Sequence, residues 1–342
     1  MHSSKLLADP LDIGGVRLRN RVFLAPMSGI TDRAFRDRAY GHGAGLVVSE
    51  MVASGELAKR NEESTRRIAR TGSGPHMVQL AGRDAHWLAE GARIAAGEGA
   101  DIIDINMGCP AKKVTGGYCG SALMREPDHA LKLIEAAVTA VSIPVTVKMR
   151  LGWDHDSLNA PDIARRAEEA GVQMVTVHGR TRCQFYTGAA DWQAIAAVKA
   201  AISIPLVANG DVRSAHDAAA ILEQSGADAV MIGRGHYGAP WVAGEIAIAA
   251  AGEGASSAPG TPAALADYVI AHYEDMLSLY GVQSGLRHSR KHLGWYLDRH
   301  APETPDALRS AIMTGIDPSR VKHALAEALG GEVSAMSMEI AA

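Results

Sequence analysis

The chain has 342 residues, of which 47% are hydrophobic and 21% charged, and its formal net charge is -4 with histidine neutral. This composition is typical of a folded globular protein and excludes wholesale disorder, while the length suits one large domain and a smaller one. The negative charge excludes a polycation that coats nucleic acid, but it is compatible with a local basic surface.

Three cysteines, Cys109, Cys119 and Cys183, occur without a C-x-x-C pair. This pattern argues against a disulfide scaffold and a structural zinc site, so we expect no metal and a reducing, cytoplasmic compartment. No apolar run reaches the length that spans a bilayer; the best candidate, near Ile202 to Ala208, is short and contains Pro205. The N-terminus has no apolar core of signal-peptide length, so we expect no association with a membrane.

Eight short β-branched runs alternate with alanine-rich stretches whose apolar residues recur at helical spacing. The predicted strands are Val22–Met27, Gly45–Glu50, His76–Ala81, Asp101–Met107, Pro144–Arg150, Met174–Gly179, Pro205–Asp211 and Ala229–Gly235. The helices predicted between them include Asp84–Glu98, Asp128–Val141, Asp162–Ala170 and Ser214–Gln224, several with Asp or Ser as N-cap. Eight such units over about 250 residues predict a (β/α)8 TIM barrel of the α/β class. A doubly wound open sheet would normally carry G-x-G-x-x-G after its first strand, and this chain does not.

A stretch rich in Gly, Pro and small residues follows the barrel pattern and predicts a linker. Beyond it the periodic stretches are all helical: Ala263–Tyr280, Gly285–His300, Thr304–Met313 and Pro318–Leu329. We therefore expect a catalytic barrel over residues 1–250, a linker over 251–262 and a small helical domain over 263–342. Trp295 and Tyr296 are expected to pack inward in that domain.

The active site of such a barrel lies at the C-terminal ends of its strands, and the sequence is polar there. The strand-end residues are Pro26, Met27, Glu50, Gln79, Asn106–Pro110, Lys148, Arg150, His178–Arg182, Asn209, Gly210, Asp211, Gly233 and Arg234. The polarity of any one of these residues is equally well explained by the solvent that borders strand ends. Their repetition around the barrel, however, predicts a site. The glycines and Arg234 after the last two strands match the usual phosphate position of this fold.

Cys109 follows the fourth strand and precedes Pro110 and a glycine-rich loop, which predicts a partly exposed thiol on rigid backbone. The alternative is a small buried hydrophobe, the commonest state of a free cysteine and the one expected for Cys119 and Cys183.

Lys148 lies inside an apolar strand, where a buried ammonium group needs an anionic partner. That partner is a bound ligand or an internal carboxylate, Glu50 or Asp104. His178 is either a site histidine or a satisfied core histidine.

These motifs follow one another in a fixed order: Ala25-Pro-Met-Ser-Gly-Ile-Thr-Asp32, Asp104-Ile-Asn-Met-Gly-Cys-Pro-Ala-Lys-Lys113, Val147-Lys-Met-Arg150, Val177-His-Gly-Arg-Thr181, Ala208-Asn-Gly-Asp211, Ile232-Gly-Arg234 and Leu286-Arg-His-Ser-Arg-Lys-His-Leu-Gly-Trp-Tyr296. In this order they resemble the tRNA-dihydrouridine synthases, from about residue 11 to about residue 325. The Asn-Met-Gly-Cys-Pro motif and the His-Leu-Gly-Trp-Tyr tail are most similar to the bacterial B-type enzymes. Ser28 and Ala111 depart mildly from the family pattern.

The resemblance implies an FMN-dependent enzyme that reduces specific uridines in tRNA to 5,6-dihydrouridine with NADPH or NADH. It implies that Cys109 is the catalytic acid. It also implies that the flavin ring lies against Pro26, Met27, Ser28, Gln79 and Lys148, with the ring edge and phosphate held by His178, Asn209, Gly210, Asp211, Gly233 and Arg234. Asn106 and Arg150 would steady the uracil.

The reaction suits these residue types. Hydride addition at C6 of uracil leaves an enolate that needs a proton at C5. An ordinary thiol, with a pKa of about 8.5, is mostly protonated at neutral pH and acidic enough to give up that proton, whereas a serine hydroxyl is far too weak an acid. The ammonium group of Lys148 would stabilise the anionic reduced ring.

A target base must leave the tRNA stack to reach a barrel mouth, so the enzyme must grip the RNA backbone. Basic side chains at the strand ends suit this purpose: Lys112, Lys113, Arg150, Arg180, Arg182 and Arg213. Residues 281–300 add a second set, opposed by one acid, Asp298: Arg287, Arg290, Lys291 and Arg299. We expect the helical domain to bind tRNA through this set, with strong dependence on salt.

Three other readings are compatible with parts of the pattern. One is a small-molecule FMN oxidoreductase resembling dihydroorotate dehydrogenase, although a free base needs no basic helical domain. Another is a flavin-free RNA-binding protein that kept the barrel. The third is a phosphate-binding isomerase, for which Glu50 would be the base. The sequence leaves open the tRNA position, the choice between NADPH and NADH, and the oligomeric state, for which a monomer is the simplest expectation.

Overall fold

The computed structural model of the protein describes residues 6–70, 72, 74–252 and 254–330. The chain divides into two units. The first comprises the residues up to Gly235 with Trp241–Ser256, and the second comprises His236–Pro240 with the residues from Ser257 onward. In the described part of the chain, no helix has both the length and the apolar character needed to cross a bilayer.

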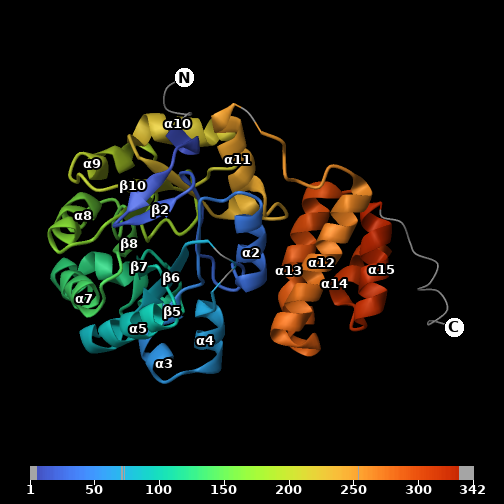
Figure 1. Ribbon diagram of the computed structural model, residues 1–342, viewed down its shortest axis with the longest axis horizontal. Coiled ribbons are helices and arrows are strands. Elements are labelled where there is room, and N and C mark those ends of the chain that lie inside the picture. The colour runs from blue at the N-terminus through green and yellow to red at the C-terminus, as the bar shows by residue number, and fades with distance from the viewer. Residues whose placement is uncertain (1–5, 71, 73, 253, 331–342) are drawn as a thin grey trace. The chain divides into compact units, whose positions relative to one another are not determined.

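The first unit contains a closed barrel of eight parallel strands (Figure 1). They are β3 (Val22–Leu24), β4 (Leu46–Val48), β6 (His76–Ala81), β7 (Ile102–Met107), β8 (Val145–Arg150), β9 (Val175–His178), β10 (Leu206–Asn209) and β11 (Ala229–Ile232). The ring closes because β4 pairs with both β3 and β6, and the two-residue strand β5 (Val52–Ala53) extends the edge of β6. Each barrel strand lies within a predicted run, so the (β/α)8 prediction is confirmed.

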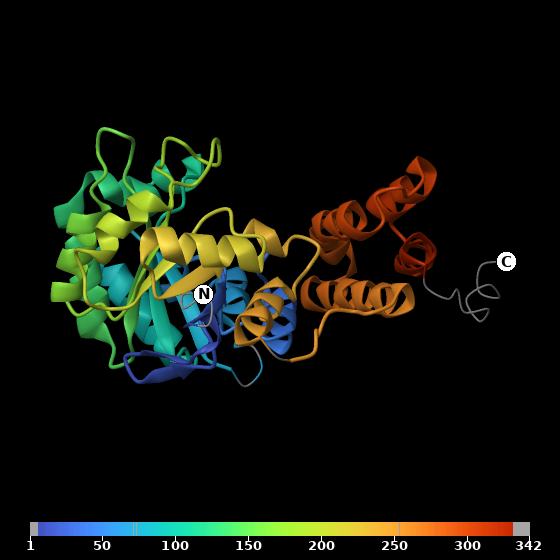
Figure 2. The same ribbon diagram turned by 90° about the horizontal axis from the view of Figure 1, so that it is seen from above.

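Helices surround the strands on the outside of the barrel (Figures 1 and 2). They are α2 (Arg33–Gly41), α3 (Ser54–Ala58), α4 (Glu62–Ile68), α5 (Ala85–Gly97), α6 (Lys112–Thr115), α7 (Pro127–Ala140), α8 (Ala160–Glu169), α9 (Ala196–Lys199), α10 (Ala215–Ser225) and α11 (Val242–Ala251). Two of the predicted N-caps form, whereas Asp128 and Asp162 lie in the first turns of α7 and α8. The side chain of Asp84 accepts from the Trp87 amide and that of Ser214 from the Asp217 amide, both at 3.1 Å.

An antiparallel hairpin that the sequence did not predict precedes the barrel, formed by β1 (Leu11–Ile13) and β2 (Val16–Leu18). Its buried residues Leu11, Ile13 and Leu18 form one cluster with residues at the starts of the barrel strands, among them Phe23 and Met77. Burying one such side chain contributes roughly 1.5–3 kcal/mol. The hairpin therefore closes the N-terminal end of the barrel, and the C-terminal ends of the strands form the open mouth.

The second unit contains α12 (Pro262–Tyr280), α13 (Val282–His300), α14 (Asp306–Thr314) and α15 (Pro318–Leu329). Tyr296 is buried, and its hydroxyl oxygen lies 3.0 Å from His272 Nδ1. Trp295 stacks on Tyr237, with the two ring centroids 3.7 Å apart. Both aromatic rings thus pack inward, as expected.

Most helix boundaries differ from the prediction by one to three residues. Helix α11 extends to Ala251 and α12 begins at Pro262, so the segment between them is residues 252–261. Helix α13 begins at Val282, three residues before the predicted start at Gly285. Residues 1–5 of the predicted barrel and 331–342 of the predicted helical domain lie outside the described residues.

Candidate active site

The barrel register places the predicted polar residues side by side at the mouth. Asn106 on β7 lies opposite Lys148 on β8, and His178 on β9 lies opposite Asn209 on β10. Parallel strands end at one edge of a sheet, so side chains far apart in the sequence converge there. The strand ends therefore form one site.

Lys148 is held at the centre of this site by Asn209, whose Oδ1 lies 3.1 Å from the lysine Nζ. Burial, and after it the charge of Arg150, lower the pKa of Lys148 to about 8, while Asp104 and Cys109 oppose the change. Glu50 is engaged elsewhere, with the Gly29 amide and with Arg67 Nε at 3.9 Å. Among the described residues no carboxylate forms an ion pair with Lys148, which leaves the other alternative, a bound anionic ligand. Within the described ranges only one of its three N–H donors has a partner, so two can serve a ligand.

His178 and Asn209 form a pair with a defined hydrogen-bond direction. Asn209 Nδ2 donates to the Met231 carbonyl at 2.7 Å, which turns Oδ1 toward the mouth, where His178 Nδ1 lies 3.0 Å away. The other ring nitrogen lies 3.3 Å from Nη1 of Arg180, which can only donate. The proton is therefore on Nδ1. Burial, with the charges of Lys148, Arg150 and Arg180, lowers the pKa of His178 well below its ordinary value, so the ring is neutral.

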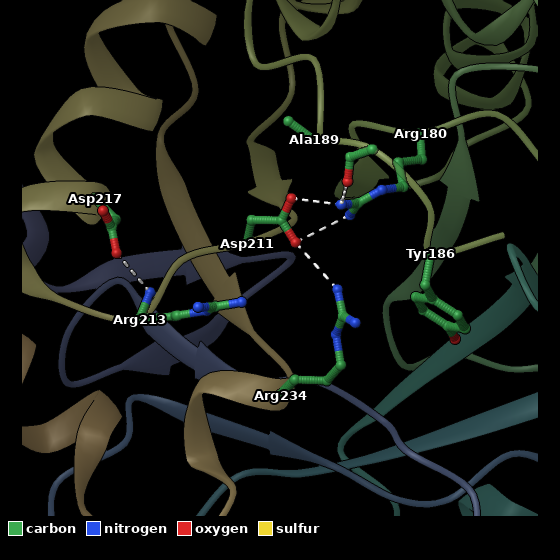
Figure 3. Close-up of a pocket in the computed structure, with 8 residues that line it drawn as sticks. Arg180, Tyr186, Ala189, Asp211, Arg213, Asp217 and Arg234 are labelled. Atoms are coloured by element: carbon green, nitrogen blue, oxygen red, sulfur yellow. Dashed lines mark hydrogen bonds and ion pairs between the residues drawn. The ribbon is translucent and has the colours of Figure 1, made fainter. Parts of the chain in front are cut away.

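Asp211 links two arginines at the edge of an open cavity of about 610 Å³ (Figure 3). Its carboxylate accepts from Arg180 at 2.6 and 3.0 Å and from Arg234 at 3.1 Å. Burial would raise the pKa of Asp211, but the hydrogen bonds from Arg180 and the Ala190 amide and the two positive charges outweigh it and lower the pKa. The cavity is lined by Arg180, Tyr186, Gly188, Ala189, Asp211, Arg213, Asp217 and Arg234.

Gly210, between Asn209 and Asp211, has no room for a side chain. Its φ is +131°, and a Cβ would lie 2.7 Å from the Cβ of Ala190. Gly233 differs, because a Cβ there would meet only ordinary contacts, the nearest with Met27 Sδ at 3.6 Å. Backbone geometry therefore requires glycine at 210 but not at 233.

The loop that carries Cys109 is tied down at both sides of that residue. The Cys109 amide donates to Asn106 Oδ1 at 3.0 Å, and its carbonyl accepts from the amide and hydroxyl of Ser121 at 3.1 and 2.9 Å. Gly120, with φ +60°, packs so closely that a Cβ would lie 2.8 Å from the Cys109 carbonyl oxygen. The cysteine is half-buried on rigid backbone, as predicted.

The expectation for the other cysteines holds only in part. Cys119 is half-buried, and burial raises its pKa. The expectation that Cys183 is buried is wrong, since it is exposed. It lies in the loop after β9, where its amide donates to the Trp153 carbonyl at 2.8 Å, and that loop runs over the surface.

The first predicted strand is shorter than expected, because a turn begins at its end. Strand β3 stops at Leu24, and the Met27 amide donates to Thr31 Oγ1 at 2.9 Å while the Thr31 amide donates back to Met27 at 3.0 Å. Pro26, Met27 and the exposed Ser28 therefore lie in a loop at the mouth.

Arg150 and Arg180 are each 2% exposed and tie loops together. Arg150 donates to the carbonyls of Gly108, Thr181 and Phe185 at 2.8–2.9 Å. Arg180 donates to the carbonyls of Thr187 and Gly188 besides Asp211. Their predicted contacts with substrate remain predictions, since the observed donors face the protein.

Tyr186 lies in the cavity and was missed in the sequence. Its ring is 53% exposed and lies between two guanidinium groups, with Cζ of Arg234 5.0 Å and Cζ of Arg150 5.4 Å from the ring centroid. The sequence did offer a signal for Tyr186, because an aromatic residue stands there in the polar loop that follows the strand-end His178.

The predicted RNA-binding set on α13 is spread along one helical turn. Arg287, Arg290 and Lys291 lie at i, i+3 and i+4, which places them on one face. Arg287 is exposed and donates to Ser284 Oγ at 3.1 Å. Arg299, counted in the same set, donates instead to the Tyr237 carbonyl at 3.4 Å. The side chain of Lys113, predicted at the barrel mouth, lies outside the described part.

Known proteins resemble this chain over most of its length. A model of the family described as "Dihydrouridine synthase (Dus)" matches residues 23–333. A protein of Rhizobium leguminosarum bv. phaseoli named "Probable tRNA-dihydrouridine synthase" is 61% identical over 323 residues, 93% of this chain and 99% of that protein. The "tRNA-dihydrouridine synthase B" of Xanthomonas axonopodis pv. citri is 44% identical over 90% of this chain and 98% of that protein.

Among solved structures, the histamine dehydrogenase of Rhizobium sp. 4-9 is similar with a TM-score of 0.58 and 14% identity. The match covers 73% of this chain and 49% of that structure, and at this identity it concerns the barrel fold alone. The family model and the relatives cover the strand-end motifs and agree with the resemblance drawn from the sequence. The chain therefore belongs to the dihydrouridine synthase family and is an enzyme of B-type character within it.

Proposed function

We propose that this enzyme reduces specific uridines of tRNA to 5,6-dihydrouridine, with FMN at the barrel mouth and NADPH or NADH as reductant. The observation that carries the proposal is the position of Lys148. Its ammonium group is buried, has no carboxylate partner among the described residues, and lies near the Cys109 thiol. A buried cation that forms no ion pair with a described carboxylate suits an anionic ligand.

The residues present fit FMN at both of its ends. Lys148, with Gln79, would hold the polar edge of the ring, and the loop of Pro26, Met27 and Ser28 would lie along it. His178 and Asn209 would fix its position, while Gly210, Asp211, Gly233 and Arg234 would surround the phosphate. Arg234 is 43% exposed at the cavity, and its guanidinium group suits a dianion. When bound and reduced, FMN supplies the hydride that adds to C6 of uracil.

The Cys109 thiol supplies the proton at C5. Its backbone is held on both sides, so the thiol stays in one place while the negative charge develops on the base. Proton transfer leaves a thiolate, and the positive charge of Lys148 favours that product because the two groups interact. Asn106 and Arg150 would steady the uracil ring.

Binding of the RNA would involve both units. The target uridine must be flipped out to reach the barrel mouth, which requires contacts to the backbone. Arg180 would support the mouth, and Arg287, Arg290 and Lys291 would bind phosphates, so residues 263–342 act as the tRNA-binding domain. The three cysteines are free, which supports a reducing cytoplasm as the working compartment.

The test is turnover on unmodified tRNA. Flavin-loaded enzyme is incubated with NADPH and tRNA from cells that lack it, and the digested RNA is examined by mass spectrometry. We expect one or a few uridines to gain two hydrogens. Yellow protein that oxidises NADPH but leaves tRNA unchanged would contradict the proposal and favour a small-molecule flavin reductase, and colourless protein that binds tRNA would favour an RNA-binding role.

A further inference from the structure

Three buried side chains form a row of hydrogen bonds that ends at the backbone of Cys109. The amides of Gly108 and Cys109 donate to Asn106 Oδ1 at 3.2 and 3.0 Å. Asn106 Nδ2 donates to Gln79 Oε1 at 2.7 Å, and Gln79 Nε2 donates to Asp104 Oδ2 at 2.7 Å. The exposed fractions of Asn106, Gln79 and Asp104 are 7%, 1% and 2%. The row therefore runs from the barrel interior to the loop that carries the thiol.

The direction of this row is fixed from both ends. Backbone amides only donate, so the side-chain oxygen of Asn106 faces the loop and its NH2 group faces Gln79. The Asp104 oxygen accepts, so the NH2 group of Gln79 faces Asp104 and its oxygen faces Asn106. Without an acceptor at 104, Gln79 has no reason to keep this orientation. If Gln79 turned, its NH2 group would face that of Asn106, and a buried donor would lose its partner.

We propose that Asp104 is a positioning residue, which holds Cys109 in place by fixing the orientation of Gln79 and Asn106. The proposal rests on the proposed role of Cys109 as proton donor. Asp104 takes no part in the chemical steps above, and it reaches the backbone of Cys109 through the two side-chain amides. Polar networks of this kind are worth more than their separate bonds when every member is satisfied.

The hydrogen bonds of Thr146 allow a specific test of this proposal. Its hydroxyl lies 2.6 Å from the other Asp104 oxygen and 3.4 Å from the Ile103 carbonyl. Because a hydroxyl can donate and accept, Asp104→Asn keeps the row: the new NH2 group donates to Thr146, which donates to Ile103. Thr146→Val also keeps the row, since Asp104 still accepts from Gln79.

Only the double variant, Asp104→Asn with Thr146→Val, removes the acceptor that fixes the orientation of the Gln79 side chain. The side-chain amide at position 104 then has no acceptor on the side of position 146 and turns its NH2 group toward Gln79. Asp104→Asn and Thr146→Val keep the shape of the side chains that they replace. The proposal predicts strong non-additivity: two mild single variants and a severe double variant. Asp104→Leu, which keeps the branching of the side chain but adds volume, removes both acceptors and is a second route to the same result.

The first measurement needs neither cofactor nor turnover. Hydrogen exchange of peptides that contain Gly108 and Cys109 is followed by mass spectrometry in flavin-free protein. We expect the exchange of these amides to be about tenfold faster in the double variant and in Asp104→Leu, and within about twofold of the parent protein in the single variants. Equal exchange in the single and double variants would overturn the proposal.

The second measurement separates the two halves of the reaction. In the double variant we expect reoxidation of bound flavin by tRNA to be slower by about 10- to 100-fold, and reduction of the flavin by NADPH to be affected much less. Unchanged reoxidation, or an equal loss in both halves, would overturn the proposal. Failure of the proposed function is recognised separately, because then the parent protein itself forms no dihydrouridine.

Discussion

Arg180 and Arg234 donate to the same carboxylate, that of Asp211, but the side chain of Arg180 is 2% exposed and that of Arg234 is 43% exposed. The Arg180–Asp211 ion pair is therefore buried on the arginine side, whereas the Arg234–Asp211 ion pair borders the solvent. A buried pair that loses one partner leaves an uncompensated charge, whereas an exposed pair contributes about 0–1 kcal/mol.

Arg180→Met is expected to destabilise the protein by about 1–3 kcal/mol, because two loop carbonyls lose a donor and Asp211 keeps only Arg234 and the Ala190 amide. Arg234→Met should change stability by less than about 1 kcal/mol but weaken FMN binding by about 10- to 100-fold. Urea denaturation and flavin titration measure the two effects. Arg213→Met, in the same cavity, is the control for general loss of positive charge. An equal effect of Arg213→Met on flavin affinity would contradict a specific role for Arg234.

Lys148→Met is expected to stabilise the flavin-free protein at pH 7. Burial lowers the lysine pKa from 10.5 to about 8; at about 1.4 kcal/mol per pKa unit, this disfavours the folded state by up to about 3 kcal/mol. Between these two pH values the unfolded chain binds more protons, so the stability of the parent protein rises as the pH rises from 8 to 10.5. The advantage of the variant should therefore be largest below about pH 8 and shrink toward about pH 10.

The check is denaturation of both proteins at about pH 7 and about pH 10, with flavin binding measured in parallel. Lys148→Met should bind FMN less tightly even though it is more stable. A variant that is less stable than the parent at neutral pH would show that the ammonium group is satisfied within the protein.

Cys109→Ala is expected to bind FMN and tRNA like the parent but to lose turnover by about 10²- to 10⁴-fold, since the proton for C5 has no donor. Cys183→Ala is a matched control on an exposed cysteine and should remain fully active. Rapid-mixing measurement of flavin reoxidation by tRNA is the readout. Turnover of Cys109→Ala at the parent rate would rule out the thiol as the acid.

Reversal of charge on α13 tests the RNA surface. Arg287→Glu with Lys291→Glu should weaken tRNA binding and reduce its salt dependence, while reduction of flavin by NADPH is unaffected. Arg320→Glu with Lys322→Glu makes the same change of charge on α15 and serves as the control. Filter binding at several salt concentrations gives both quantities. If the two pairs of substitutions had equal effects, the α13 face would have no special role.

The barrel and the position of its mouth could be predicted because both follow from local pattern. Strand period and helix caps act within a few residues, and parallel strands must end at one edge, which brought Lys148, His178 and Asn209 together. The β1–β2 hairpin was missed although Gly14-Gly15 marks its turn, since strands of three residues are too short to show a period.

The state of individual side chains at the mouth could not be predicted. The sequence predicted Arg150 and Arg180 to contact the RNA. In the structure they donate to carbonyls of loops, and only the folded chain defines the paths of these loops. The exposure of Cys183 has the same origin. The row from Asp104 to Cys109 was equally hidden, because its middle member, Gln79, comes from a different strand.

The assignment of His236–Pro240 to the second unit has a consequence for any exchange of parts between relatives. The backbone passes from one unit to the other after Gly235, after Pro240 and after Ser256, so the helical unit is not a contiguous piece of sequence. A fragment that starts at Ser257 would lack Tyr237, on which Trp295 stacks, and would expose that ring. A graft of the helical unit onto another barrel would have to carry both pieces together.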